Sequence, residues 1–451
     1  PHGRAPPTPS SPTAVTCSVV HITTATSPNL SENGDSLRVR FLDPEGSPVH
    51  HNRLLSVTLV VATITGLATT GAAAATAPSV RSAPTATHRT VDTTVCKHTR
   101  NSRSRCFAIR VDRVAHGRVR HESTPLGYGA RDLESAYSLP AASAGHGETV
   151  AVVDAYDDPS AAADLAVYRQ HYGLPACTTS NRCFRKVDEN AGTDYPAPDS
   201  GWAEEESLDL DMVSAACPNC HLLLVEATTT SMTNLGKAVD TAAALGADAI
   251  SNSYGGPDAS DRSYGRFYHH PGIAVTASAG DNGYGASYPA SSKWVSAVGG
   301  TSLSRSSGAR GFTETAWSDG GSGCSTLNTA PWQSEVITGC AGRAVADVSA
   351  VADPATGVAV YDSDSDEGAA GWLEFGGTSA SAPLVAGIFA LGGATSSVVD
   401  GSFLWDHHAG LHDVTSGANG TCAIPQWCRA RTGWDGPTGW GTPDGVAAFA
   451  G

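Results

Sequence analysis

The residues with the clearest chemical potential lie in the stretch Phe375-Gly-Gly-Thr-Ser-Ala-Ser-Ala-Pro383. This stretch predicts a strand, a tight glycine turn and a helix of small residues that begins near Ser379. A hydroxyl at a helix N-terminus lies beside free backbone N–H groups and the positive end of the helix dipole, both of which favour a developing negative charge. Ser379 is therefore a candidate nucleophile, although serine is also a preferred helix cap with no chemical role.

A serine nucleophile needs a base, and the stretch Trp202-Ala-Glu-Glu-Glu-Ser-Leu-Asp-Leu-Asp-Met-Val213 offers carboxylates. Glu205 and Asp209 are four residues apart, so a helix places their side chains on one face, one turn from each other. Glu206 has Leu210 at that spacing and cannot form such a pair. The alternative is a solvated acidic first turn, which the helix dipole also favours.

A third acid follows an apolar run, in Ala277-Ser-Ala-Gly-Asp-Asn-Gly283. An ionised Asp281 would repel an oxyanion, whereas a protonated one can donate an O–H hydrogen bond to it. Asp-Asn-Gly is also a common turn, and by itself this segment would be interpreted as one. Three acids in one pocket would raise each other's affinity for protons.

The Ser379 segment resembles the nucleophile segment shared by subtilisins and sedolisins; subtilisin-like enzymes carry their base as a histidine in a His-Gly-Thr turn, and no histidine here has that context. The His-Gly pairs at positions 116 and 146 both precede the predicted strand that ends at Asp154, and neither is followed by Thr. Histidines further along the chain, such as His221 and His270, lack a His-Gly-Thr turn. Without a histidine partner, Asp154 is interpreted as structural.

Taken together, the three segments resemble the sedolisin (serine-carboxyl peptidase) family. The resemblance covers about residues 124–451 and implies a Ser379 nucleophile, a Glu205 base held by Asp209, and Asp281 as the oxyanion donor. The Ala216-Cys217-Pro218 turn also fits the family. The base must be ionised while the oxyanion donor is neutral, so we expect activity below pH 6 that falls near neutrality.

The stretch Ser251-Asn-Ser-Tyr-Gly-Gly256 resembles the family segment whose backbone pairs with an extended substrate. This resemblance assigns substrate binding to Ser253, Tyr254 and Gly255, with Tyr254 standing where relatives often have tryptophan. A simple exit from a strand into a loop is the alternative, because glycine pairs mark loops in general.

Two C-terminal segments resemble the sedolisin calcium site, in which aspartates and backbone carbonyls supply about six oxygens to Ca²⁺. The matching positions are Asp413, the carbonyls of Val414, Arg431 and Gly433, and Asp435. Relatives usually have glycine at the position of Arg431. Two turn aspartates in a Gly-rich tail are the alternative.

The elements that must position these residues alternate between short apolar strands and helices. This pattern predicts an α/β, subtilisin-like fold with a mostly parallel sheet and helices on both faces. In such a sheet, ligands bind in the loops after the strands, where the candidate residues stand. The predicted strands cover 149–154, 221–226, 249–253, 273–278, 294–298 and 373–375, and the predicted helices cover 158–172, 205–216, 232–245 and 379–391.

The N-terminal region predicts export. A short charged stretch, an apolar run from Leu54 to Leu67 and a small-residue tract predict a signal peptide over residues 48–77, with a transmembrane anchor as the alternative. Residues 1–47 are Pro- and Ser-rich and are interpreted as an upstream or disordered extension. Residues 78–123 form a short pro-like segment, and residues 124–451 form the peptidase domain.

The cysteines also favour an oxidising compartment. Ten of the 11 fall into five close pairs, which predicts disulfides. Zinc at Cys217-Pro-Asn-Cys220 is the alternative, but a second Cys-x-x-Cys is missing. The predicted pairs are Cys96/Cys106, Cys177/Cys183, Cys217/Cys220, Cys324/Cys340 and Cys422/Cys428, which leaves Cys17.

The composition narrows the choice of partners. The net charge is −16 and the chain has no basic stripe, so nucleic acid is not an expected partner. We expect a secreted, monomeric endopeptidase that acts on proteins or peptides, with no membrane attachment after signal cleavage. Two alternatives remain open: a subtilisin-type Ser/His/Asp peptidase with a displaced histidine, and a secreted non-catalytic binding protein on a decayed peptidase fold.

Overall fold

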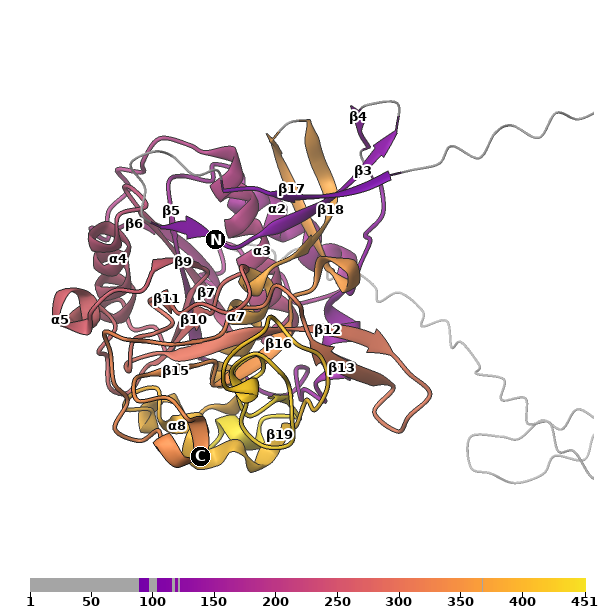
Figure 1. The fold of residues 1–451 in the computed structure, drawn as a ribbon. Coiled ribbons are helices and arrows are strands. Elements are labelled where there is room, and N and C mark those ends of the chain that lie inside the picture. Colours follow the sequence, from indigo (N-terminus) through magenta and orange to yellow (C-terminus); the bar gives the residue numbers. More distant parts are fainter. Residues whose placement is uncertain (1–88, 97–103, 116–117, 121, 367) are drawn as a thin grey trace, which may run out of the picture. The chain divides into compact units, whose positions relative to one another are not determined.

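The continuous apolar runs of the sequence form an eight-stranded sheet at the centre of the fold (Figure 1). The computed structural model describes residues 89–96, 104–115, 118–120, 122–366 and 368–451, so the predicted extension and signal peptide lie outside it. The strand order is β13-β12-β10-β8-β5-β7-β6, with β16 beside β12. All neighbouring pairs are parallel except β12 and β13. The strands are β5 (Thr149–Ala155), β6 (Phe184–Asp188), β7 (His221–Ala227), β8 (Ala249–Asn252), β10 (Ala274–Ser278), β12 (Ser296–Arg305), β13 (Phe312–Ala316) and β16 (Val348–Val351).

Helices cover both faces of this sheet, as the alternating pattern predicts. The longest two, α3 and α7, pack against each other and are buried along almost their whole length. The helix α4 contacts β5 and β7 on the opposite side (Figure 1). The principal helices are α1 (Ala130–Ala136), α2 (Ala161–Tyr172), α3 (Ser200–Ala216), α4 (Met232–Ala244) and α7 (Thr378–Gly392).

The start of α3 lies five residues before the predicted start at Glu205. The side chain of Asp199 caps this helix by accepting a hydrogen bond from Trp202 N at 3.1 Å. An N-terminal cap of this type satisfies a backbone N–H that has no partner within the helix. Because the helix begins at Ser200, Glu205 lies in its buried middle and not in its first turn. The alternative that Glu205 belongs to a solvated acidic first turn is therefore wrong.

The described strands of the pro-like segment, which begin at Arg89, are part of the fold. An antiparallel sheet of order β1-β3-β18-β17 joins it to strands that lie more than 230 residues later, and β4 pairs with β3. A separate short strand, β2, pairs with β9. These strands are β1 (Arg89–Thr94), β2 (Arg105–Cys106), β3 (Ile109–Ala115), β4 (Arg118–Val119), β9 (Tyr254–Pro257), β17 (Val358–Asp366) and β18 (Ala369–Gly376).

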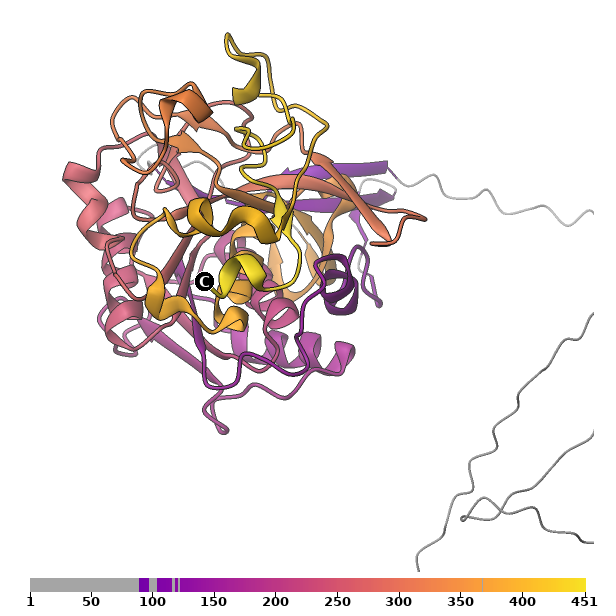
Figure 2. The ribbon, with the colours of Figure 1, turned by 90° about the horizontal axis from the view of Figure 1, so that it is seen from below.

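The C-terminal end of the chain packs back onto the core. Phe449 contacts Phe389 of α7 edge-to-face, with ring centroids 5.0 Å apart. Figure 2 shows this end of the chain from below. The contact anchors the tail that carries the predicted calcium ligands.

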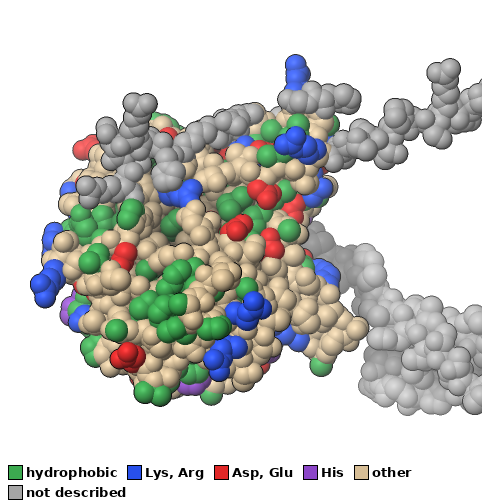
Figure 3. Space-filling model, viewed as in Figure 1, with side chains coloured by type: hydrophobic (Ala, Val, Ile, Leu, Met, Phe, Trp, Pro, Cys, Tyr) green, Lys and Arg blue, Asp and Glu red, His purple; other side chains and the backbone are tan. Residues whose placement is uncertain are grey.

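All five predicted cysteine pairs form disulfides, so Cys217 and Cys220 bond to each other. None of the helices in the described part of the chain is long and apolar enough to span a membrane. On the face shown in Figure 3, lysine and arginine side chains lie in separate small groups among polar, acidic and apolar ones.

Candidate active site

The candidate nucleophile lies at the start of α7. Gly377 precedes the helix with φ of 92°, a left-handed conformation that favours glycine. The Ser379 hydroxyl is buried and donates a hydrogen bond to Ser253 O at 3.1 Å. It also accepts one from the backbone N–H of Phe107 at 3.0 Å. The serine therefore faces a chain segment that comes from the N-terminal part of the protein.

The predicted base pair lies beside this hydroxyl. Glu205 and Asp209 are both fully buried in the middle of α3, and they hydrogen-bond each other. Glu205 lies close enough to the Ser379 hydroxyl for that group to lower its pKa, and its Oε2 accepts from the backbone N–H of Ala108 at 2.9 Å. Asp209 accepts from the hydroxyl of Ser253 at 2.8 Å. The i, i+4 spacing thus places both carboxyls on the face of α3 that points to Ser379.

Burial raises the pKa of both acids well above the usual range. The Ser379 hydroxyl and the backbone N–H of Ala108 act against this rise at Glu205, and the Ser253 hydroxyl acts against it at Asp209. The buried pair therefore keeps protons to a higher pH than exposed carboxyls do.

A fourth acid, Asp154, adds to this cluster, and its electrostatic role was missed by sequence reasoning. It lies at the end of β5, is fully buried, and has no hydrogen-bond partner for either carboxyl oxygen among the described residues. Its charge raises the pKa of both Glu205 and Asp209, and burial raises its own pKa to about 8. Its position at the carboxyl end of a central parallel strand was the signal that could have identified it.

Asp281 follows β10 and lies on the other side of the serine turn. Its Oδ1 accepts hydrogen bonds from the backbone N–H and the hydroxyl of Thr378, both at 2.8 Å. Its Oδ2 is buried and has no partner among the described groups. Burial raises the pKa of Asp281 to about 7, against the lowering effect of the Thr378 bonds. The side chain is thus neutral at acid pH, with one oxygen free to carry and donate a proton.

The segment predicted to bind substrate does pair with an extended chain. Tyr254 and Gly255 of β9 pair antiparallel with Cys106 and Arg105 of β2, respectively. Ser253 O accepts from Phe107 N at 3.2 Å. The side chain of Tyr254 points into the core, where its hydroxyl donates to Asn252 at 2.7 Å, so only its backbone faces the cleft.

The predicted calcium residues also converge. Asp413 Oδ2 accepts from Gly433 N at 3.0 Å, and Asp435 Oδ2 accepts from Arg431 N at 2.8 Å. Burial raises the pKa of Asp435 to about 7, and the nearby charge of Asp413 acts in the same direction. Val414 follows Asp413 and is buried. Two neighbouring carboxylates are hard oxygen donors of the kind that Ca²⁺ prefers.

The parallel sheet, with a serine at the start of a buried helix, defines a fold of the subtilisin class. In agreement, residues 187–396 match the family model described as the subtilase family. Kumamolisin of Bacillus sp. is 30% identical over 385 residues, which are 75% of this chain and 66% of that protein. Sedolisin of Pseudomonas sp. is 36% identical over 180 residues, or 36% of this chain and 29% of that protein.

The solved structures agree with these relatives. Pseudomonas sedolisin, a serine-carboxyl proteinase complexed with pseudo-iodotyrostatin, matches with a TM-score of 0.60 and 26% identity, covering 71% of this chain and 96% of that one. The chain belongs to the sedolisin family. It spans about two thirds of the length of kumamolisin and less than one third of that of the curated sedolisin.

Proposed function

We propose that this protein is a serine-carboxyl endopeptidase that hydrolyses peptide bonds at acid pH. The observation that carries the proposal is that the consecutive backbone N–H groups of Phe107 and Ala108 donate to Ser379 Oγ at 3.0 Å and to Glu205 Oε2 at 2.9 Å, so the buried carboxyl lies beside the nucleophile and the hydroxyl lowers its pKa. Among residues 104–115, 118–120, 122–366 and 368–451, no hydrogen bond joins a histidine to Ser379. Within this part of the chain, the titratable side chain beside the nucleophile is the Glu205 carboxyl, which favours this function over the subtilisin-type alternative.

In the first half of the proposed reaction, Glu205 takes the proton of Ser379 as the hydroxyl attacks the substrate carbonyl. Asp209 holds Glu205 in place and stabilises its ionised form through their shared proton. The protonated Oδ2 of Asp281 donates a hydrogen bond to the oxyanion of the tetrahedral intermediate and keeps its proton. Protonated Glu205 then gives its proton to the leaving amine, and an acyl-enzyme remains on Ser379.

Water hydrolyses the acyl-enzyme by the reverse sequence. Glu205 takes a proton from the water, which attacks the ester carbonyl, and Ser379 recovers its proton when the ester bond breaks. Extended substrate is held by backbone pairing to Ser253, Tyr254 and Gly255, in the manner that β2 adopts. This pairing explains how the site would orient a peptide without reading every side chain.

Two further assignments accompany this function. We assign structural Ca²⁺ to Asp413, Asp435 and the carbonyls of Val414, Arg431 and Gly433, where it would neutralise two adjacent carboxylates and stabilise the C-terminal loops. Extracellular action is supported by the five disulfides, because such bonds persist in oxidising compartments. Cleavage of the predicted signal peptide over residues 48–77 would release the protein.

The test is a pH–rate profile on a protein substrate and a quenched peptide, for wild type, Glu205→Gln and Ser379→Ala. We expect wild-type turnover below pH 6, a decline toward neutrality, and almost none in either variant. An active-site fluorophosphonate or peptide-aldehyde probe should label wild type but not Ser379→Ala. A flat profile from pH 7 to 9 would contradict the acid mechanism, and absence of both labelling and turnover would favour a non-catalytic protein.

A further inference from the structure

The strand β2 lies against the segment predicted to bind substrate, in the manner of an extended peptide. It extends the small sheet of β9 and β11 (Ser287–Tyr288), in the order β11-β9-β2. Residues 105 and 106 pair antiparallel with β9, and the N–H of Phe107 donates to Ser253 O at 3.2 Å. These three residues therefore show how an extended chain lies relative to Ser379.

The place of Phe107 fixes the register of such a chain. Its N–H donates to Ser379 Oγ at 3.0 Å. A Cβ placed on Gly377 would lie 1.7 Å from Phe107 O and 2.8 Å from Asp281 Oδ2, so the carbonyl and the proposed oxyanion donor lie beside the same glycine. We number substrate residues backward from the bond that is cut. Phe107 then has the place of the first substrate residue, whose carbonyl is attacked, and Arg105 has the place of the third.

The side chain of the first substrate residue enters a pocket with glycine walls. A Cβ on Gly255 would lie 2.7 Å from Cε2 of the Phe107 ring, and one on Gly280 would lie 3.6 Å from Cζ. The ring is buried, and both glycines line the cavity that it occupies. A side chain at position 255 would overlap the ring, so the glycine leaves a slot for a flat, apolar group.

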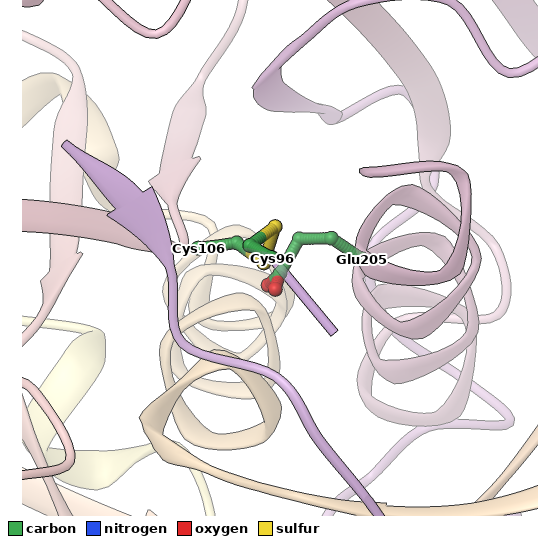
Figure 4. Close-up of side chains that lie close together, drawn as sticks. All are labelled: Cys96, Cys106 and Glu205. Atoms are coloured by element: carbon green, nitrogen blue, oxygen red, sulfur yellow. A yellow bond between two sulfur atoms is a disulfide. The ribbon is translucent and has the colours of Figure 1, made fainter. Parts of the chain in front are cut away.

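The second and third side chains point to opposite sides, because side chains alternate along an extended chain. The side chain of Cys106 turns toward α3. Figure 4 shows its disulfide with Cys96 beside the Glu205 carboxylate, and one atom of each side chain lies within 4.8 Å of the others. Arg105 lies on the other side, with its guanidinium carbon 5.7 Å from the centroid of the Phe107 ring. The third side chain therefore reaches the rim of the pocket that holds the first.

At that rim, the third side chain contacts Asn282. Arg105 Nη2 donates to Asn282 Oδ1 at 3.1 Å. Asn282 lines the same cavity as Gly255 and Gly280, and it is exposed to solvent. Arginine and lysine side chains have only donors, whereas the amide oxygen is an acceptor. The contact therefore suits a basic side chain.

Acidic groups near Asn282 favour a positive charge at this place. Burial raises the pKa of Asp281 to about 7, and the charge of Arg105 acts in the opposite direction, so the guanidinium lies within electrostatic reach of that carboxyl. The charge of Asp319 raises the pKa of Asp281, and the backbone oxygen of Asp319 accepts from Gly283 N at 2.8 Å. Two acids thus lie at the end of the cleft that receives the third side chain, where they would repel an acidic residue.

We infer that Asn282 makes the cleft selective for a basic third residue, so that the favoured substrates carry arginine or lysine two residues before a flat, apolar first residue. The inference rests on the proposed function and names the substrate class of the same site. The reaction itself is unchanged, since Asn282 contacts only the side chain of the third residue. Selectivity arises because a basic side chain gains an acceptor at the rim, whereas an acidic one faces two further acids.

The test is a set of quenched peptides that share phenylalanine as the first residue and differ only in the third, which is arginine, lysine, glutamine or glutamate. Hydrolysis is measured at pH 5 with wild type and with Phe107→Asp, whose altered side chain leaves the glycine pocket to the added peptide. Mass spectrometry of the products locates the cut. We expect cleavage after phenylalanine, with kcat/KM for the arginine peptide about 2–10-fold above that for the glutamine peptide. The glutamate peptide should have the lowest value.

Substitution of Asn282 tests its role directly. Asn282→Leu removes the acceptor, so the ratio of kcat/KM between the arginine and glutamine peptides should fall to about one. Asn282→Asp places a carboxylate at the same point and should raise that ratio about 2–5-fold, because an ionised acceptor forms a stronger hydrogen bond. The matched control is Asn190→Leu, at an exposed asparagine after β6, which should keep the wild-type ratio. Thermal melting checks that all three variants fold.

The outcomes separate this inference from the proposed function. If the peptides are cut after phenylalanine at the same rate whatever the third residue, or if Asn282→Leu keeps the preference for arginine, the inference is wrong and the function stands. If the peptides are cut only at another bond, the register taken from β2 is wrong, and the inference fails with it. If neither wild type nor Phe107→Asp cuts any of the peptides at pH 5, the proposed function fails as well.

Discussion

The carboxyl group of Asp281 is held from one side only, by Thr378. The backbone N–H and the hydroxyl of Thr378 both donate to Oδ1 at 2.8 Å, and Oδ2 is left without a partner among the described groups. Two donors on one oxygen favour placing the proton of the neutral acid on the other. The residue that begins the nucleophile helix thus orients the proposed oxyanion donor.

The first prediction concerns the pH at which Asp281 loses the proton that it would donate to the oxyanion. Since burial raises the pKa of Asp281 to about 7, the acid loses its donor proton as pH rises through that value. We expect Asp281→Ala to lower kcat by about 10²–10³-fold at pH 4, the usual effect of removing one oxyanion donor. The amide of Asp281→Asn can donate a hydrogen bond at every pH. This variant should therefore retain more activity than Asp281→Ala, and its kcat should not fall near pH 7.

The measurement is a kcat and kcat/KM profile from pH 3 to 8 on a peptide substrate. Thr378→Val serves as a positioning control, because it removes the hydroxyl bond to Oδ1 but leaves the backbone N–H bond. It should shift the decline to higher pH, since that bond lowers the pKa of Asp281. If kcat of Asp281→Asn falls near pH 7 as it does in wild type, a group other than Asp281 causes the loss of activity at that pH.

The second prediction separates the proposed base from its neighbour. Glu205→Gln should lower kcat by about 10²–10⁴-fold at all pH values, because an amide cannot take the Ser379 proton. Glu206→Gln is the matched control. That side chain is equally buried, but after burial the groups that raise its pKa most are Glu226 and Asp158. Similar losses in the two variants would argue against the assignment of Glu205.

The proximity of the candidate carboxyls to Ser379 could be predicted from sequence because their spacing carries geometric information. An i, i+4 pair on one helix must share a face, and the end of a parallel strand must open toward the ligand edge. The role of Asp154 could not be predicted in this way. Its effect depends on full burial beside α3, and burial of a polar residue is a property of tertiary packing that a local pattern does not contain.

The pairing of β2 with the predicted substrate-binding segment also could not be predicted from the sequence. Ser253, Tyr254 and Gly255 were predicted to pair with substrate, but nothing in the local sequence indicates that Arg105 and Cys106 would take that place. The pairing depends on β3 joining β18, a contact between segments more than 250 residues apart. The N-terminal segment was predicted to be pro-like from its position alone. Its pairing with β9 could not be predicted, because it depends on this long-range sheet.

The third prediction is that the protein is more stable in acid than at neutral pH. Burial raises the pKa of Asp154 and Glu226 to about 8 and that of Asp362 to about 9. Because these folded-state values lie above those of the unfolded chain, their stabilising contribution is complete below about pH 4 and is lost as pH rises through 8 to 9. Melting temperature should therefore fall steadily from pH 4 to pH 9.

Thermal unfolding of Ser379→Ala, which avoids self-digestion, measures this trend. Asp362→Asn should flatten it, because the amide stays neutral at every pH and Asp362 has no hydrogen-bond partner on either oxygen within the described chain. Asp406→Asn, at an exposed site, should leave the slope as it is. A melting temperature that rises toward pH 8 would mean that these acids are ionised in the folded protein.

The last prediction concerns calcium. Asp413 and Asp435 lie close enough for one charge to affect the other, and their loops are held by bonds to Gly433 N and Arg431 N. If Ca²⁺ binds the folded state alone, its removal by EDTA at pH 6 should lower the melting temperature by about 5 °C or more. Asp413→Asn should melt at the lower temperature with or without added Ca²⁺, and Asp406→Asn should respond to Ca²⁺ as wild type does. Since the proposed ion site lies in the C-terminal loops rather than at Ser379, removal of Ca²⁺ should affect stability first and kcat only through unfolding. If neither EDTA nor added Ca²⁺ changes the melting temperature, the ligand set proposed for these loops is wrong.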